Sequence, residues 1–140
     1  MTREEKKIYR MVDANYNRAK EALRVVEDVL RFSGASGTTA ASWKTARHHL
    51  TAILLGFQKS PKQIVACRDI AADPGKTSYV RDRKSRRCLH DLFVSNIQRA
   101  EEALRVLEEC SKAVDPKAAP LFQKMRFKIY ALEKRDLAKF

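Results

Sequence analysis

Apolar residues recur along this chain at the three- and four-residue spacings of amphipathic helices. No stretch alternates with a period of two for long enough to indicate a strand. The first helix is expected to open at a capping box of Thr2 and Glu5 and to close at Ser33-Gly34. The pattern therefore predicts an all-α fold.

Further helix boundaries follow from the capping residues. Thr38 or Thr39 is expected to cap a second helix, which runs to about Gln58. Ser60-Pro61 suits the start of a short helix, with Pro at the first helical position. Asp115-Pro116 is expected to start the last long helix in the same way.

Two segments of the chain repeat each other. NYNRAKEALRVVED (15–28) matches NIQRAEEALRVLEE (96–109) at a constant offset of 81 residues. The helices that follow also match, in the placement of Arg47 within 43–53 and Arg126 within 122–132. A duplicated half predicts pseudo-twofold symmetry.

The repeat organises the whole chain into a single helical domain, 1–140. We expect a bundle of four main helices, made of two pseudo-twofold-related helical hairpins joined by an irregular loop. Repeat 1 covers about 2–58, the connecting loop about 59–82 and repeat 2 about 83–138.

Each repeat carries a polar pair on its apolar arc. On a helical wheel of 12–32, Asn15 and Arg18 fall among the Ala, Leu and Val residues, and Asn96 and Arg99 do the same in the second repeat. An arginine that points inward needs an anion, either a buried carboxylate or a ligand. Because the pair occurs twice in a basic chain, the pattern favours a shared ligand pocket.

The opposite arc holds charged residues at helical spacings. Arg24 lies three or four residues from Glu21, Glu27 and Asp28, and the second repeat shows the same arrangement. We interpret these charges as helix-surface ion pairs, each worth a few tenths of a kcal/mol. The second set comprises Glu102, Arg105, Glu108 and Glu109.

Composition changes this picture in two ways. The 140 residues are 44% hydrophobic and 33% charged, which is typical of a folded domain, and the net charge of +12 calls for an anionic partner. No run is long and apolar enough to predict a signal peptide or a membrane span. The cysteines, odd in number and without CxxC spacing, predict a reducing, cytoplasmic compartment. Neither a disulfide framework nor a metal site is indicated by the spacing of Cys67, Cys88, Cys110, His48, His49 and His90.

The segment RDRKSRR (81–87) is the one concentrated run of basic residues. We interpret it as a solvated linker. Contact with nucleic acid is the less favoured alternative, because the sequence shows neither a helix-turn-helix pattern nor an aromatic stacking platform.

The connecting loop contains Gly75-Lys76-Thr77, which resembles the end of a Walker A loop. The motif fails, because it needs a glycine at position 70, where this chain has Ile70. The same loop still offers cations that can hold phosphate, carboxylates that can bind Mg²⁺, and a glycine that allows a ligand close to the backbone. These residues are Arg68, Asp69, Asp73, Gly75 and Lys76.

Taken in order, these motifs resemble one family. DANYNRAKEALRVVEDVLRF, RH at 47–48, CRDIAADPG at 67–75, NIQRAEEALRVLEE and MRFKIYALEK are similar to the hydroxymethylpyrimidine-phosphate kinase domain often fused before thiamine-phosphate synthase. The resemblance covers nearly the whole chain. Pro74 departs from it, because a small aliphatic residue is expected there.

The resemblance implies that the chain uses ATP and Mg²⁺ to convert hydroxymethylpyrimidine phosphate into its diphosphate. We expect Asp69 and Asp73 to place Mg²⁺ and Lys76 to neutralise charge on the transferred group. Four residues match the central loop of the family: Arg68, Asp69, Asp73 and Gly75. We favour these four as site residues over Lys76 and Thr77. The expected substrate- or phosphate-binding residues are Asn15, Arg18, Arg47, Arg68, Gly75, Asn96, Arg99 and Arg126.

One alternative is a non-catalytic module that binds a pyrimidine or thiamine phosphate and partners a separate thiamine-phosphate synthase. A pocket built from half of each repeat could be completed within one chain or across a homodimer.

Overall fold

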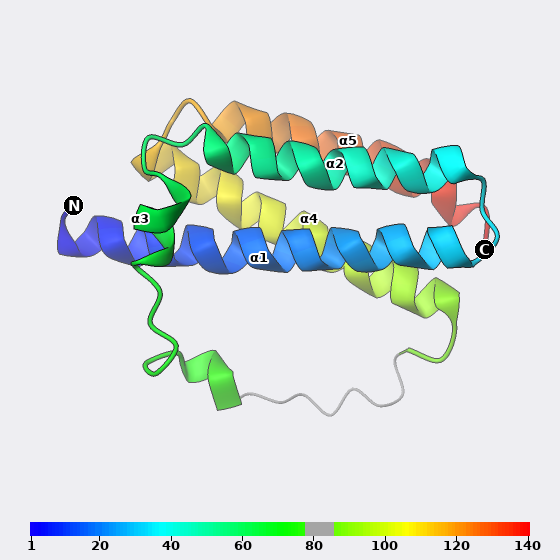
Figure 1. Cartoon of the computed structure of the whole chain (residues 1–140), viewed down its shortest axis with the longest axis horizontal. Coiled ribbons are helices and arrows are strands. Elements are labelled where there is room, and N and C mark those ends of the chain that lie inside the picture. The colour runs from blue at the N-terminus through cyan, green and yellow to red at the C-terminus, as the bar shows by residue number, and fades with distance from the viewer. Residues whose placement is uncertain (78–85) are drawn as a thin grey trace.

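The computed structural model describes residues 1–77 and 86–140, and this part of the chain contains helices and no strand. Four long helices form a bundle, so the predicted all-α fold is confirmed (Figure 1). The elements are α1 (Arg3–Phe32), α2 (Gly37–Leu55), α3 (Pro61–Val65), the 3₁₀ turn η1 (Pro74–Thr77), α4 (Leu89–Val114) and α5 (Ala119–Leu137).

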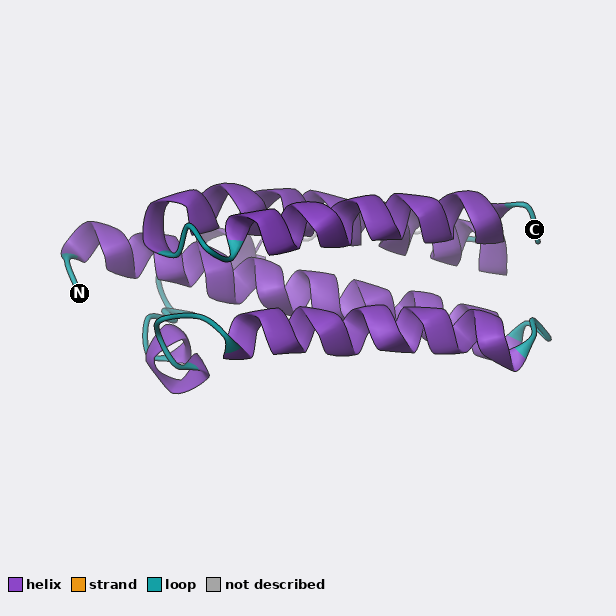
Figure 2. Ribbon diagram, turned by 90° about the horizontal axis from the view of Figure 1, so that it is seen from above, coloured by secondary structure: helices purple, strands orange, loops and turns teal. Residues whose placement is uncertain are grey.

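The long helices form two antiparallel hairpins, α1–α2 and α4–α5. The most extensive contact joins α1 to α4, and α2 lies beside α5 (Figures 1 and 2). Core positions recur at the offset of the repeat: Ala19 and Ala100 are both fully buried, as are Leu23 and Leu104. Equivalent side chains of the two repeats therefore build the centre of the bundle.

The first helix has the ends that the sequence predicts. Thr2 and Glu5 form a capping box, with each side chain bonded to the backbone N–H of the other residue. The helix ends at Phe32, and Gly34 follows with a φ of +83°, a left-handed conformation that favours glycine. The short helix α3 also starts with a capping box, between Ser60 and Gln63.

Two other predicted helix starts are wrong. The helix α2 begins at Gly37, with Ser36 rather than Thr38 or Thr39 at its N-cap, and the Ser36 hydroxyl bonds to the hydroxyls of both threonines. Its last residue is Leu55 rather than Gln58.

The helix α5 begins at Ala119 rather than at Asp115-Pro116. The buried Asp115 carboxylate accepts a hydrogen bond from the backbone N–H of Gln58 at 2.9 Å. Asp115 therefore ties the segment after α2 to the end of α4 instead of capping α5.

A buried ion pair joins the two helices of each hairpin. Glu27 on α1 accepts a hydrogen bond from Arg47 on α2 at 2.9 Å, and Glu108 on α4 accepts one from Arg126 on α5 at 3.1 Å. Glu27 is 5% exposed and Glu108 is 4% exposed. The predicted pairs of Arg24 with Glu27 and of Arg105 with Glu108 are present, at 3.8 and 3.0 Å. The expected surface location of the two glutamates is wrong, because each is buried and also meets an arginine of the neighbouring helix.

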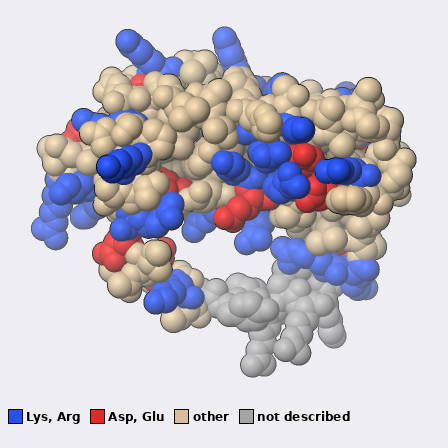
Figure 3. Space-filling model, viewed as in Figure 1, with Lys and Arg blue, Asp and Glu red and all other residues tan. Residues whose placement is uncertain are grey.

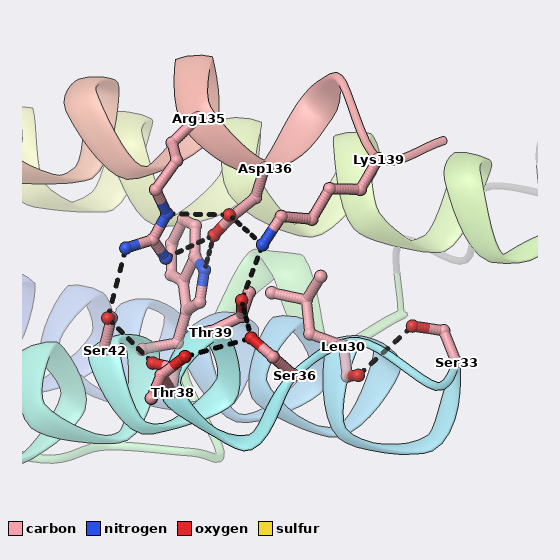
Figure 4. Close-up of polar contacts among 10 residues, drawn as sticks. Leu30, Ser33, Ser36, Thr38, Thr39, Ser42, Arg135, Asp136 and Lys139 are labelled. Carbon is pink, nitrogen blue, oxygen red and sulfur yellow. Dashed lines mark hydrogen bonds and ion pairs between the residues drawn. The ribbon is translucent and has the colours of Figure 1, made fainter.

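Asp136 connects α5 to α2 at the end of the bundle where the C-terminus lies (Figures 1 and 4). Its fully buried carboxylate accepts hydrogen bonds from Trp43 Nε1 at 2.8 Å and from Arg135, and Lys139 lies 3.0 Å away. Burial by itself raises the pKa of Asp136, but these hydrogen bonds outweigh burial and hold the pKa below its ordinary value. The folded structure therefore favours the ionised carboxylate of Asp136.

Two glutamates lie close together where α4 meets α5, Glu101 and Glu133. Burial, followed by the proximity and hydrogen bonding of Glu133, raises the pKa of Glu101 to about 7. Glu101 therefore binds a proton more readily in the folded chain than in the unfolded one.

The Asp136 network predicts a large loss of stability when its carboxylate is removed. We expect Asp136→Ala to lower the free energy of unfolding by about 2–4 kcal/mol, since it leaves the buried Trp43 N–H and a guanidinium without an acceptor. Urea unfolding followed by circular dichroism measures the change. Glu109→Ala is the matched control, because Glu109 is 47% exposed and its ion pairs are worth less than about 1 kcal/mol. Equal losses in the two variants would contradict this role for Asp136.

The Glu101–Glu133 pair predicts a dependence of stability on pH. The raised pKa means that the folded chain binds more protons than the unfolded one, so stability falls as the pH rises from 4.5 to about 7. Glu101→Gln should flatten that slope in urea midpoints measured across this range. Glu102→Gln, on the exposed side of the same turn, should keep it. A slope unchanged by Glu101→Gln would show that other groups produce it.

Candidate functional site

The connecting segment is fastened to α1 by two arginines. Arg68 donates from Nε and Nη2 to the two carboxylate oxygens of Asp13, at 2.6 and 2.7 Å, and Asp13 is 5% exposed. This contact raises the pKa of Arg68. Arg10 donates to the carbonyl of Asp69 at 2.6 Å. These bonds tie the start of the segment, just after α3, to α1.

Two carboxylates shape the backbone of this segment. Asp69 Oδ1 accepts the N–H of Ala72 at 3.0 Å, and Asp73 Oδ1 accepts the N–H of Gly75 at 2.8 Å. A Cβ at Gly75 would lie 3.2 Å from Asp73 Oδ1, so the close turn explains the glycine. Residues Pro74–Thr77 form the 3₁₀ turn η1, so Gly75-Lys76-Thr77 does not open a long helix as a Walker A loop does.

The segment and α1 line a partly open cavity of about 330 Å³, within the size range of small-molecule sites. The structure thus brings together most of the residues predicted from the central loop, with one arginine of the first repeat. The predicted residues that line it are Arg18, Arg68, Asp69, Asp73, Gly75 and Lys76. Arg10, Asp13, Ala14, Asn17 and Ile70 complete the lining.

The cations of this cavity divide into two groups. Arg68 is committed to Asp13, and Arg10 lies 4.0 Å from Asp69 Oδ2. Among the described residues, by contrast, no carboxylate lies within ion-pair distance of Arg18 or Lys76. Figure 3 shows acidic and basic side chains gathered along α1 and the connecting segment. The cavity can therefore offer two cations to an anion and two carboxylates to a cation.

The asparagines of the two repeats are buried as predicted, but the arginines are not. Asn15 and Asn96 are 7% and 8% exposed, and each donates from Nδ2 to the backbone carbonyl four residues earlier, at 2.9 Å. Arg18 and Arg99 are exposed, so their predicted inward orientation is wrong. Their long side chains start near the apolar arc and extend to solvent.

Arg47 and Arg126 lie outside the loop-covered cavity. Their side chains are 15% and 14% exposed, and each pairs with the buried glutamate of its own hairpin. A phosphate at either arginine would have to compete with this carboxylate. In the structure, these two arginines join the helices of their hairpins.

Sequence reasoning missed the residues that place the connecting segment. Asp13 and Arg10 have Val94 and Asp91 at the equivalent positions of the second repeat. A comparison of the repeats for differences rather than identities could have found them. Arg68 meets Asp13 because the first repeat alone has a carboxylate at this position.

A second group that the spacing did not predict lies at the start of α4. The ligand atoms of Cys88, His90 and Asp91 lie within 4.8 Å of one another, so these residues could hold a metal ion. All three cysteines are unpaired. The group is separate from the residues that line the loop-covered cavity.

Two predictions about partners concern membranes and nucleic acids. No helix in the described part of the chain is long and apolar enough to cross a membrane. Residues 81–85 of the basic run RDRKSRR lie outside the described residues, as does the end of the predicted connecting loop, 78–82.

Comparison with known proteins gives three longer relatives of the same name. Thiamine-phosphate synthase of Gloeobacter violaceus is 38% identical over 130 residues, which cover 93% of this chain and 36% of the relative. The synthase of Nostoc sp. is 36% identical over 126 residues, 90% of this chain and 34% of the relative. The synthase of Rhodopirellula baltica is 31% identical over 128 residues, which cover 91% of this chain and 34% of the relative.

The chain thus spans about a third of the length of these relatives. No solved structure matches it. The family model described as the ThiD2 family matches residues 10–135. Because that match covers most of the sequence, the chain belongs to the ThiD2 family.

Proposed function

We propose that this chain acts in thiamine biosynthesis, in the cytoplasm, as a kinase that converts hydroxymethylpyrimidine phosphate into its diphosphate with ATP and Mg²⁺. The observation that carries the proposal is the loop-covered cavity, where Arg18 and Lys76 face no carboxylate partner among the described residues and Asp69 and Asp73 lie beside them. The names of the longer relatives and the resemblance of the motifs support the thiamine context.

The chemistry of this reaction suits the groups that line the cavity. A phosphate oxygen of the acceptor attacks the γ-phosphorus of ATP, the bond to the β-phosphate oxygen breaks, and ADP leaves. A phosphate ester has lost most of its second proton at pH 7, so the attacking oxygen needs no general base. The protein has to position the two phosphates and neutralise their charge, and the lining holds basic side chains but no histidine.

The carboxylates of the connecting segment fit a magnesium ion bound together with phosphates. Mg²⁺ in such sites typically takes one or two carboxylates and completes its shell with phosphate oxygens and water. Asp69 and Asp73 each use Oδ1 to accept a backbone N–H, which fixes the orientation of the carboxyl group. We propose that these two residues hold the ion, which supplies charge neutralisation at the transferred group.

The decisive measurement is diphosphate formation from hydroxymethylpyrimidine phosphate and ATP·Mg²⁺, with ADP followed in parallel. Asp73→Asn should lower kcat by about a hundredfold or more, because it removes a charge while its amide oxygen can still accept the N–H of Gly75. Asp91→Asn is the matched control, since Asp91 also accepts a backbone N–H, from Arg87, but lies outside the cavity. A folded chain that forms no diphosphate would refute the kinase.

Lys76 provides a second variant in the same assay. Lys76→Ala should lower kcat by about a hundredfold if its ammonium neutralises charge on the transferred phosphoryl group. Lys62→Ala, at an exposed position on α3, should leave the rate unchanged. Equal rates in the two variants would remove Lys76 from the proposed machinery.

The longer relatives favour one other candidate, a non-catalytic module that binds a pyrimidine or thiamine phosphate next to a thiamine-phosphate synthase. The same experiment separates the two functions. The binding module gives a thermal shift with hydroxymethylpyrimidine phosphate but consumes no ATP.

A further inference from the structure

A second pocket lies in the groove where α1 crosses α4. Its volume is about 230 Å³. We call it the groove pocket. Its lining consists of Arg18, Glu21, Ala22, Val25, Asn96 and Arg99.

The groove pocket repeats part of a third cavity, which adjoins the loop-covered cavity and shares Arg10, Ala14, Arg18 and Asp73 with it. Asn15, Arg18 and Val106 line this third cavity, and Asn96, Arg99 and Val25 line the groove pocket. Each set combines an asparagine and an arginine of one helix with a valine of the other. All three pairs of residues are separated by the 81 residues of the repeat. The duplication therefore produces two half-sites of the same chemistry.

Each half-site presents one guanidinium, from Arg18 or Arg99. Neither has a carboxylate within ion-pair distance among the described residues, whereas Arg24 and Arg105, six residues further along the same helices, are both paired with acids. The buried asparagines are fixed by their bonds to backbone carbonyls, and Asn15 Oδ1 lies 3.4 Å from Arg18 Nη1. A free guanidinium beside a fixed amide is suited to a phosphate.

The two sites differ in charge, and this difference separates their ligands. The loop-covered cavity has four basic and three acidic side chains, so it can hold a polyphosphate together with a divalent cation. Among the described residues, the groove pocket has two arginines and a single carboxylate, Glu21, and none of its lining residues comes from the connecting segment. Its charge and its smaller volume fit a small phosphate monoester.

We propose that the groove pocket binds the phosphoryl acceptor and that the loop-covered cavity binds the nucleotide, an assignment that rests on the proposed kinase function. The two ligands are chemically alike, because adenine and the acceptor each contain an aminopyrimidine ring and each carries phosphate. Two half-sites of the same chemistry are therefore suited to binding these two similar ligands. Arg18 lines both pockets, so its guanidinium lies between the donor and the acceptor phosphates.

Equilibrium binding measured by calorimetry tests the assignment without relying on turnover. The probes are hydroxymethylpyrimidine phosphate alone and a non-hydrolysable ATP analogue with Mg²⁺. Arg99→Gln should weaken binding of the pyrimidine phosphate about ten- to a hundredfold, the usual effect of losing a hydrogen bond to a charged group, and should change nucleotide binding less than about threefold. Lys76→Gln should show the reverse selectivity, and Arg18→Gln should weaken both ligands.

Arg105→Gln is the matched control, because Arg105 is an exposed arginine on the same helix that does not line the groove pocket. It should leave both affinities unchanged. Selective losses without diphosphate formation would support the two sites and refute the kinase. Diphosphate formation with an unchanged KM for the pyrimidine phosphate in Arg99→Gln would refute the groove assignment and keep the kinase. A chain that binds no pyrimidine phosphate refutes both.

Discussion

The requirement that a buried carboxylate meet a donor determines how this bundle is held together. Charge removed from water is costly unless it is paired, and the described helices bury five acidic residues almost completely. Glu27 and Glu108 take the arginines that join each hairpin, Asp136 takes Arg135, and Asp115 takes the N–H of Gln58. The fifth, Asp13, takes Arg68 and so fixes the connecting segment. The same type of contact thus supports both the scaffold and the candidate site.

The site exists at one end of the α1–α4 crossing because the duplication is imperfect. Arg68 reaches Asp13, and the equivalent position in the second repeat is Val94, which offers no acceptor. The connecting segment therefore docks on the first repeat and brings its carboxylates to Arg18. Arg99, the counterpart of Arg18, lines the groove pocket. The two equivalent arginines thus have different surroundings, and the repeats differ at both positions that hold the segment, Asp13 and Arg10.

Much of this arrangement could be predicted from the sequence, and the errors share a physical cause. The four long helices, the capping box at Thr2 and the burial of Asn15 and Asn96 follow from local patterns of three or four residues. A helical wheel places each Cα direction but not the end of a long side chain, so Arg18 and Arg99 were expected to point inward. Nor does local spacing show that Glu27 meets Arg47, twenty residues away, rather than only Arg24. Contacts between elements need the packed structure.

The pairing of the arginines also argues against using every repeated arginine for ligands. Binding a phosphate at Arg47 or Arg126 would draw that arginine away from the buried Glu27 or Glu108, which would keep only its exposed partner, Arg24 or Arg105. An anion at Arg18 or Arg99 displaces no carboxylate among the described residues. These two arginines are therefore the positions of the repeat where ligand binding does not oppose folding. Since both line the groove at the α1–α4 crossing, the contact that builds the core also sets the distance between the two candidate phosphate sites.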